Sequence, residues 1–327
     1  MSKLIQWEQQ IGRRLQLRDL FVFFTVVEYG SMARAAATLG VSTPSISEVI
    51  AGLEHALGVR LLDRSPKGVV TTAYGDALLA RGRAAFDELR QGIRDIEFIA
   101  DPRAGEVRIG CPESIAAGLL VPVLERLSKD YPRVRFHVEQ VRTPTVEFPE
   151  LHERKVDLVL ARLVKLPAQG VINDELNAEV LFDDPFSLVV GEKSKWARRR
   201  NVGLADLVDE PWVMTPLDAL GGAFVAEAFR TSGLKPPNLV ISTFSIHLRN
   251  NLVGSGQFIT ALPASVLRVN GKRHSLKELP IQLPGQQSPV AIVTLRNRTL
   301  GPAVQLFIQC AREVAKSMAG VPKARKG

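Results

Sequence analysis

Three short segments near the start of the chain carry an apolar pattern and end at a glycine, namely Gly30, Gly40 and Gly58. Within each segment the apolar residues recur at steps of three and four, which predicts three amphipathic helices in residues 17–58. Glycine adopts the left-handed conformation that ends a helix at little cost. Ser31 precedes the second segment, and Ser42 or Thr43 the third, as N-capping residues. The pattern predicts a small helical module whose last two helices are joined by a tight turn.

The third predicted helix begins with small polar side chains rather than large apolar ones. A short helix, a tight turn and a helix of this kind are typical of a helix-turn-helix, whose second helix reads base edges in the major groove. We expect base readout from Ser42, Thr43, Pro44, Ser45, Ser47 and Glu48.

Two extended runs follow around the turn at residues 65–68 and predict a hairpin wing. We expect phosphate contacts from Arg34, Arg64 and Lys67. Residues 17–72 are therefore interpreted as a winged helix-turn-helix DNA-binding domain, mainly α, preceded by an N-terminal extension at 1–16.

Residues 73–100 contain no proline and carry apolar residues at alternating steps of three and four. We interpret 73–105 as a long linker helix with a hinge, which pairs with the same helix of another subunit. The dimerisation seam is expected at Leu79, Phe86, Leu89, Ile93 and Ile96, with Gly82 letting two backbones approach. The alternative is an amphipathic helix that packs on its own domain.

After residue 105 predicted strands and helices alternate, which is typical of α/β domains with parallel sheets and ligands at the strand C-terminal ends. Strands are expected at 106–111, 134–141, 156–161, 186–190, 212–214, 239–242 and 258–262, and helices at 115–130, 146–153, 223–231, 245–253 and 301–318. The length allows an α/β domain at 106–320 made of two subdomains with a cleft between them. Subdomain I is expected at about 106–180 and 281–320, subdomain II at about 181–280, and a basic tail at 321–327.

Composition excludes several protein classes. The chain has 327 residues, a hydrophobic fraction of 46% and only two cysteines, which argues against disorder and against a disulfide framework. Neither a transmembrane run nor an export signal is apparent, so a cytoplasmic protein with no membrane partner is expected. The net charge of +8 fits a polyanion partner. The chain carries no nucleotide-binding, metal-ligand or G-x-S-x-G pattern, so no enzyme activity, cofactor or metal is expected.

Residues 17–76 resemble the LysR-type transcriptional regulators. The matching residues are Leu20, Phe23, Val26, Gly30-Ser31-Met32, Ala35-Ala36, Leu39, Ser42-x-Pro44-Ser45-Ile46-Ser47, Leu53-Glu54, Leu57-Gly58, Leu61-Leu62-x-Arg64 and Thr72-x-x-Gly75. A weaker resemblance continues through Val107-Arg108-Ile109-Gly110, Leu120-x-Pro122, Tyr131-Pro132, Val156-Asp157-Leu158, Gly254-x-Gly256 and Leu262-Pro263. Thr43 and Glu48 depart from the family's usual residues, which bears on the DNA sequence that is read.

The resemblance implies a DNA-binding transcriptional regulator with an effector-binding domain of periplasmic-binding-protein type, controlled by a small molecule in its cleft. It also implies homodimers that pair into homotetramers on double-stranded DNA. The alternative is a ligand-binding or enzymatic α/β protein with an incidental helical N-terminal module. The two interpretations differ in whether the protein binds specific DNA or turns over a substrate.

Residues at the ends of the predicted strands are the candidates for the effector pocket. They are Glu113, Ser114, Thr143, Thr145, Arg162 and Thr215. Arg162 resembles a pocket arginine of LysR-type members that bind carboxylates, and its alternative is an ion pair with Glu113 or another carboxylate. Hydroxyls with one arginine suit a small polar or anionic effector, such as a polyol acid, sugar or sugar phosphate. Cys111 is either an apolar filler or a redox-sensing thiol of the kind some family members use.

Overall fold

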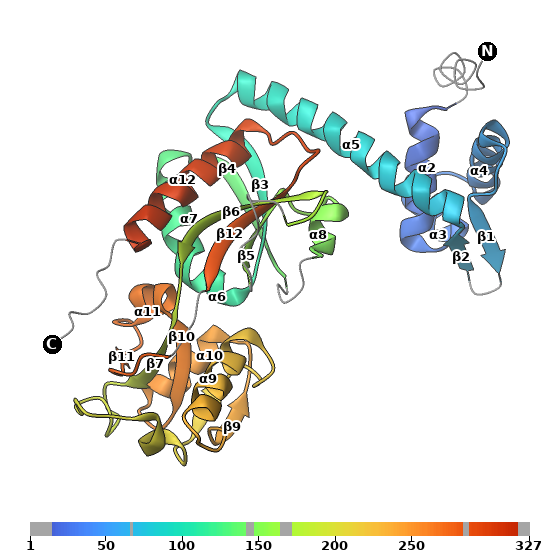
Figure 1. The fold of residues 1–327 in the computed structure, drawn as a ribbon. Coiled ribbons are helices and arrows are strands. Elements are labelled where there is room, and N and C mark those ends of the chain that lie inside the picture. Colours follow the sequence, from blue (N-terminus) through green and yellow to red (C-terminus); the bar gives the residue numbers. More distant parts are fainter. Residues whose placement is uncertain (1–14, 66–67, 142–146, 164–171, 284–287, 320–327) are drawn as a thin grey trace. The chain divides into compact units, whose positions relative to one another are not determined.

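A computed structural model describes residues 15–65, 68–141, 147–163, 172–283 and 288–319. The chain divides into two compact units, Met1–Leu89 and Arg90–Gly327 (Figure 1). Each unit is described by itself below.

The first unit is a winged helix-turn-helix. Its elements are α2 (Leu17–Tyr29), α3 (Met32–Leu39), α4 (Thr43–Leu57), β1 (Leu62–Ser65) and β2 (Gly68–Thr71). The caps are as the sequence predicts, because Ser31 and Ser42 accept backbone N–H groups at the starts of α3 and α4. Gly30, Gly40 and Gly58 end the three helices at φ of 59°, 66° and 69°. Strands β1 and β2 pair as an antiparallel hairpin.

The helix α5 (Ala73–Ala100) spans 28 residues. In its first half, Leu79 and Phe86 pack against the core of the helical module. Gly82 receives the ring of Phe24, since a Cβ at this position would lie 2.3 Å from Phe24 Cζ. The expectation that Gly82 admits a second linker helix is therefore wrong for this face, which contacts the chain's own α2.

The second unit contains two mixed five-stranded sheets. The first has the order β4-β3-β5-β12-β6, formed by β4 (Arg133–Gln140), β3 (Ala104–Cys111), β5 (Leu158–Arg162), β12 (Pro289–Leu295) and β6 (Leu176–Asp183). The helices of this subdomain I are α6 (Glu113–Ile115), α7 (Val121–Asp130), α8 (Pro149–His152) and α12 (Pro302–Ala319), with a π-helical turn at Ala116–Leu120. Strand β5 is buried along its whole length, between two apolar clusters.

The second sheet has the order β11-β7-β10-β8-β9, formed by β11 (Leu276–Glu278), β7 (Phe186–Gly191), β10 (Ile259–Pro263), β8 (Trp212–Met214) and β9 (Leu239–Ser242). This subdomain II carries a 3-10 turn at Leu204–Leu207, α9 (Leu220–Thr231) and α10 (Ile246–Gly254). Helix α11 (Ala264–Asn270) follows β10 directly and contacts Ala117 of the first subdomain through Asn270.

The sheets differ from the all-parallel arrangement that the alternation predicts. Strand β12 runs antiparallel to both β5 and β6, and β10 runs antiparallel to β7. The strands β6, β11 and β12 and the helix α11 were not expected from the sequence. The chain passes between the subdomains at Asp183–Phe186 and at Pro263–Ala264, as Figure 1 shows for β6, β7 and β10.

Candidate nucleic-acid interface and effector site

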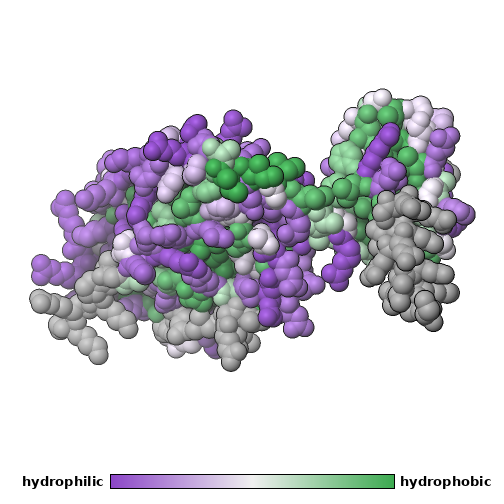
Figure 2. Space-filling view, turned by 90° about the horizontal axis from the view of Figure 1, so that it is seen from above, coloured by the Kyte–Doolittle hydropathy of each residue, from purple (hydrophilic) through white to green (hydrophobic). Residues whose placement is uncertain are grey.

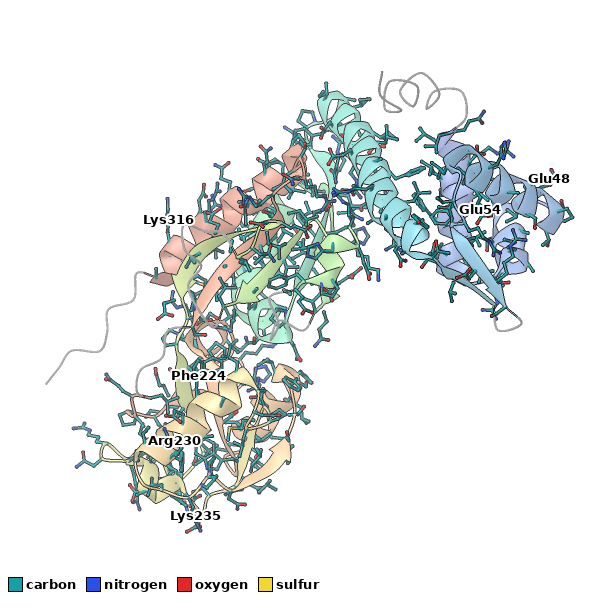
Figure 3. All side chains as sticks on the ribbon, turned by 45° about the vertical axis from the view of Figure 1, so that its right-hand side comes forward. Glu48, Glu54, Phe224, Arg230, Lys235 and Lys316 are labelled. Carbon is teal, nitrogen blue, oxygen red and sulfur yellow. The ribbon has the colours of Figure 1, made fainter. Side chains whose placement is uncertain are left out.

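The start of α4 forms an exposed polar surface. Thr43, Pro44 and Glu48 are exposed, and Glu48 projects from the outer side of the module in Figure 3. The hydroxyls of Ser42 and Ser45 bond to each other at 2.8 Å, and Ser42 also caps the helix. These two side chains are therefore exposed but engaged in the cap.

Ser47 is half-buried and its hydroxyl donates to the Sδ of Met32 at 3.4 Å. This contact turns the side chain toward α3, away from the surface that Glu48 occupies. Further along the same helix Ala51, Gly52 and His55 are exposed, so the open surface extends beyond the residues expected from the sequence.

The carboxylate of Glu54 in α4 holds the start of the wing by hydrogen bonds. Oε1 of Glu54 accepts the backbone N–H groups of Leu61 and Leu62 at 2.7 and 3.2 Å, so this glutamate anchors β1 (Figure 3). Arg64, in the wing, and Arg34, in α3, are both exposed. Lys67 lies outside the described residues.

The second half of α5 carries an exposed apolar stripe. Leu89, Ile93, Ile96 and Ile99 are 49, 60, 68 and 78% exposed. Figure 2 shows apolar residues among the hydrophilic ones on the face it presents. The residues of the predicted dimerisation seam therefore have two environments. Leu79 and Phe86 pack within the first unit, whereas Leu89, Ile93 and Ile96 are exposed in a single chain.

Arg162 is buried at the end of β5 and is paired with Asp184. Its Nη2 lies 2.5 Å from Oδ2 of Asp184, and its Nη1 donates to Asp184 O and to Ser288 Oγ. The Cζ atom of Arg162 lies 5.4 Å from the ring centroid of Phe186. The Phe186 ring also contacts the ring of Phe224 in α9, which Figure 3 labels, with the two rings tilted relative to each other. Of the two expectations for Arg162, this structure contains the ion pair, with Asp184 rather than Glu113 as its partner.

Asp184 also accepts from the start of α11. Its Oδ1 takes the backbone N–H of Ser265 at 2.8 Å and its Oδ2 the hydroxyl of Ser265 at 2.6 Å. The carboxyl group thereby links β5 and the start of α11, while the backbone N–H of Asp184 donates to Ser288 O. Sequence reasoning missed this residue, because nothing local marks Asp184 as a partner of groups that lie 22 and 81 residues away in the chain.

Glu113 begins α6, two residues after the end of β3, and contacts the other subdomain. Its Oε1 accepts the backbone N–H groups of Ile246 and His247, at 2.8 and 3.2 Å. These residues open α10, whose own cap, Ser245, accepts the N–H of Leu248. A carboxylate at a helix N-terminus is favoured by both the free N–H groups and the helix dipole.

The expected hydroxyls are only partly accounted for. Ser114 is half-buried beside Glu113, and Oγ1 of Thr215 is buried without a hydrogen-bond partner among the described residues. Thr143 and Thr145 lie outside the described residues.

Arg249 lies in the first turn of α10. In the structure the side chain is buried, its Nη1 donates to Ala261 O, and its Nε has no partner in the described part of the chain. Burial lowers the pKa of Arg249 to about 10, while the charge of Glu113 acts to raise it.

Both cysteines are buried as free thiols in the core of subdomain I. Burial raises the pKa of the Cys111 thiol to about 12. Because the thiolate is the reactive form, this environment favours the apolar-filler interpretation over a redox-sensing thiol.

The described residues hold no group of three or more side chains arranged to bind a metal ion. Within the same residues no helix is both long and apolar enough to cross a bilayer.

Two family models match the chain. Residues 17–76 match the model "Bacterial regulatory helix-turn-helix protein, lysR family", and residues 100–316 match the "LysR substrate binding domain". Together they cover most of the chain.

Two relatives match this chain over nearly its whole length. The transcriptional regulator GbpR of Azospirillum brasilense is 28% identical over 91% of this chain and 86% of its own length. The DNA-binding transcriptional dual regulator OxyR of Escherichia coli is 27% identical over 94% of this chain and 97% of its own length. Full-length CbnR, solved in complex with its target DNA, has a TM-score of 0.62 at 20% identity, covering 92% of this chain and all of that one.

GbpR and OxyR are transcriptional regulators rather than enzymes. The likeness to CbnR shows that the fold described above occurs in a full-length LysR-family structure. The chain therefore belongs to the family of LysR-type transcriptional regulators.

Proposed function

We propose that the protein binds a specific operator in the cytoplasm and that a small molecule, bound where the two subdomains meet, controls transcription from it. The observation that carries the first part is the exposed start of α4 beside the hairpin of β1 and β2. An α-helix fits the major groove, and a wing reaches the adjoining backbone. Thr43, Pro44 and Glu48 are the side chains best placed for base readout, with Ser42 and Ser45 contributing through the cap they share.

Arg34 and Arg64 supply the proposed phosphate contacts, together with Lys67. Removing any one of these cations should weaken binding to all DNA sequences alike and lower the salt slope by about one unit. A base-reading residue behaves differently, because its loss changes the preference among sequences. Glu48 is a candidate acceptor for the N4 amino group of cytosine.

A gel-shift titration against the DNA upstream of the protein's own gene, at several salt concentrations, tests this part. Arg64→Ala is expected to weaken specific and nonspecific binding equally and to flatten the salt dependence. Thr43→Ala is expected to leave nonspecific binding unchanged and to alter the preferred sequence. Unchanged binding and salt slope in Arg64→Ala would remove the wing from the interface.

The proposed assembly is a homodimer that pairs into a homotetramer. The exposed stripe Leu89, Ile93 and Ile96 supports pairing through α5, because an apolar stripe of this length on one helix face is rarely left in water. Two paired helices would set the spacing of two α4 helices on DNA with half-sites about one helical turn apart or a multiple of it.

The proposed effector is a small polar or anionic molecule, such as a polyol acid, sugar or sugar phosphate. Its support lies in polar groups at or after the strand ends: Ser114, the first turn of α10, and the Thr215 hydroxyl, which is buried without a hydrogen-bond partner among the described residues. Arg162 is occupied by Asp184, so we assign it to holding the crossing segments together rather than to the effector. A thermal-shift screen of sugar acids and sugar phosphates against the full chain tests the class, with Thr215→Val as the variant that should lose the shift.

A further inference from the structure

Glu113 links the two subdomains of the second unit at the start of α10. Glu113 belongs to subdomain I, whereas Ile246 and His247 belong to subdomain II, 133 and 134 residues further along the chain. The neighbouring donors of α10 have partners within the helix's own cap, since Leu248 N–H binds Ser245 Oγ and Arg249 N–H binds Ser245 O. Among the described residues, the first two N–H groups of α10 are thus satisfied from across the junction.

A second observation marks the same turn as a site for negative charge. Arg249 is 3% exposed, and among the described residues no carboxylate forms an ion pair with it. Its Nη1 donates to Ala261 O at 3.1 Å, and its Nε has no described partner. A buried guanidinium without an anion in contact is unfavourable, and Glu113 is the acidic group whose charge acts on it. The cation and the helix N-terminus therefore both favour an anion where Glu113 lies.

We propose that the first turn of α10, backed by Arg249, is a carboxylate-binding site, and that Glu113 fills it as a tethered ligand that holds the two subdomains together. An effector with a carboxylate group takes this place by displacing Glu113, which breaks one contact between the subdomains and makes another through the effector. This inference rests on the proposed effector role of the junction and adds the chemical group that is recognised and the residue that competes for it.

A purely structural cap makes a different prediction from a binding site. If Glu113 only caps α10, its removal loosens the turn and no added molecule restores it. If the turn is a carboxylate site, Glu113→Ala leaves an empty place that free acetate can enter, because acetate replaces the carboxylate group that the substitution removes.

Hydrogen exchange of the full chain, followed at the amides of residues 246 and 247, separates these cases. Glu113→Ala is expected to raise exchange at these amides roughly tenfold, which is the size of an anion's contribution at a helix N-terminus. Acetate should lower it again toward the value of the unchanged protein, whereas acetamide at the same concentration and ionic strength should not. Acetate should have no effect on the unchanged protein, whose site is filled.

Two variants control the experiment. Ser245→Ala removes the cap from the same turn and should raise exchange at residue 248 without any response to acetate. Glu113→Gln retains the shape and an oxygen acceptor but not the charge, so its exchange should be intermediate; it also serves as the test protein if Glu113→Ala does not fold. Unchanged exchange in both Glu113 variants, or equal rescue by acetate and acetamide, would overturn the proposal.

This test is independent of DNA. A protein that shows the acetate response but fails to bind its upstream DNA would retain the carboxylate site and lose the proposed operator function. The reverse outcome, operator binding without an acetate response, would retain the function and remove the site.

Discussion

Asp184 shows how one buried side chain can hold a two-subdomain module together. It is 1% exposed and receives Arg162 from β5 and Ser265 from the start of α11, while its backbone N–H donates to Ser288 O. A buried ion pair is not by itself a large net stabilisation, because both charges lose their hydration. Removing one partner is costly, however, since the remaining charge stays buried.

Arg162→Ala should therefore lower the free energy of unfolding of the second unit by about 3–5 kcal/mol. The measurement is urea unfolding of the full chain followed by tryptophan fluorescence, since Trp196 and Trp212 are both buried in subdomain II. Arg230→Ala is the matched control, because Arg230 pairs with Glu227 at the surface and its loss should leave the midpoint unchanged. An Arg162→Ala protein of normal stability that fails only to respond to an effector would restore the pocket role expected from the sequence.

At the scale of single elements, the sequence predicted best what depends on neighbours along the chain. The three helices of the first unit end at Gly30, Gly40 and Gly58 as expected, because capping and glycine conformation are local properties. The strands β6 and β12 were missed, and with them the antiparallel pairing of the first sheet. The direction in which a strand pairs depends on partners that are distant in sequence, here β12 with β6 more than 100 residues earlier.

The same limit applies to the candidate site. The exposed start of α4 could be predicted from residue types and periodicity. Asp184 and Arg249 could not, because an acidic residue between two strands and an arginine in a short helix become notable only when their partners, Arg162 and Glu113, are brought near them.

Gly52 in α4 gives a prediction at this scale. It lies in the exposed interior of the helix, and a Cβ added there would have no atom within 4 Å. Gly52→Ala should stabilise the first unit by about 0.5–1 kcal/mol, measured as a higher thermal midpoint, because alanine loses less backbone freedom on folding. Gly40→Ala should do the opposite, since Gly40 has a φ of 66° at the end of α3. If Gly52→Ala also weakens operator binding, the DNA approaches the helix at this glycine.

The exposed stripe of α5 gives a second prediction. Leu89→Asp should leave the folded single chain almost unchanged, because Leu89 is already 49% exposed, but it would place a carboxylate in an apolar interface between paired helices. Light scattering is expected to show a smaller assembly than that of the unchanged protein at equal concentration. Glu97→Ala, which changes an exposed polar residue of the same helix, should not alter the mass. An unchanged mass for Leu89→Asp would place the interface elsewhere.

At the scale of the whole molecule, both units have apolar cores, but the second unit also contains a buried cluster of ion pairs. The first is a small apolar core with capped helices. The second contains a buried cluster around Asp157, whose Oδ1 lies 2.9 Å from Arg108 Nη2 and 2.7 Å from Arg298 Nη2. Arg94, in the last part of α5, lies 3.6 Å from the same oxygen and 2.5 Å from Glu106. This cluster fastens the end of α5 to subdomain I.

The Asp157 cluster predicts that acid destabilises the second unit before the first. Burial alone would raise the pKa of Asp157, but the charge and hydrogen bonds of Arg108, with Arg298, outweigh it and hold the pKa below the usual value. The stability that this carboxylate contributes is therefore fully present above the unfolded pKa of about 4 and is lost as the pH falls through the lower folded value.

Urea unfolding of the full chain at pH 7 and at steps below pH 4 should show a second-unit transition whose midpoint falls with acid. Asp157→Asn should be destabilised at pH 7, because three arginines lose their shared anion, and should show less further loss on acidification. The two curves should therefore converge at low pH. Parallel curves for the two proteins would mean that other carboxylates control the acid response of the second unit.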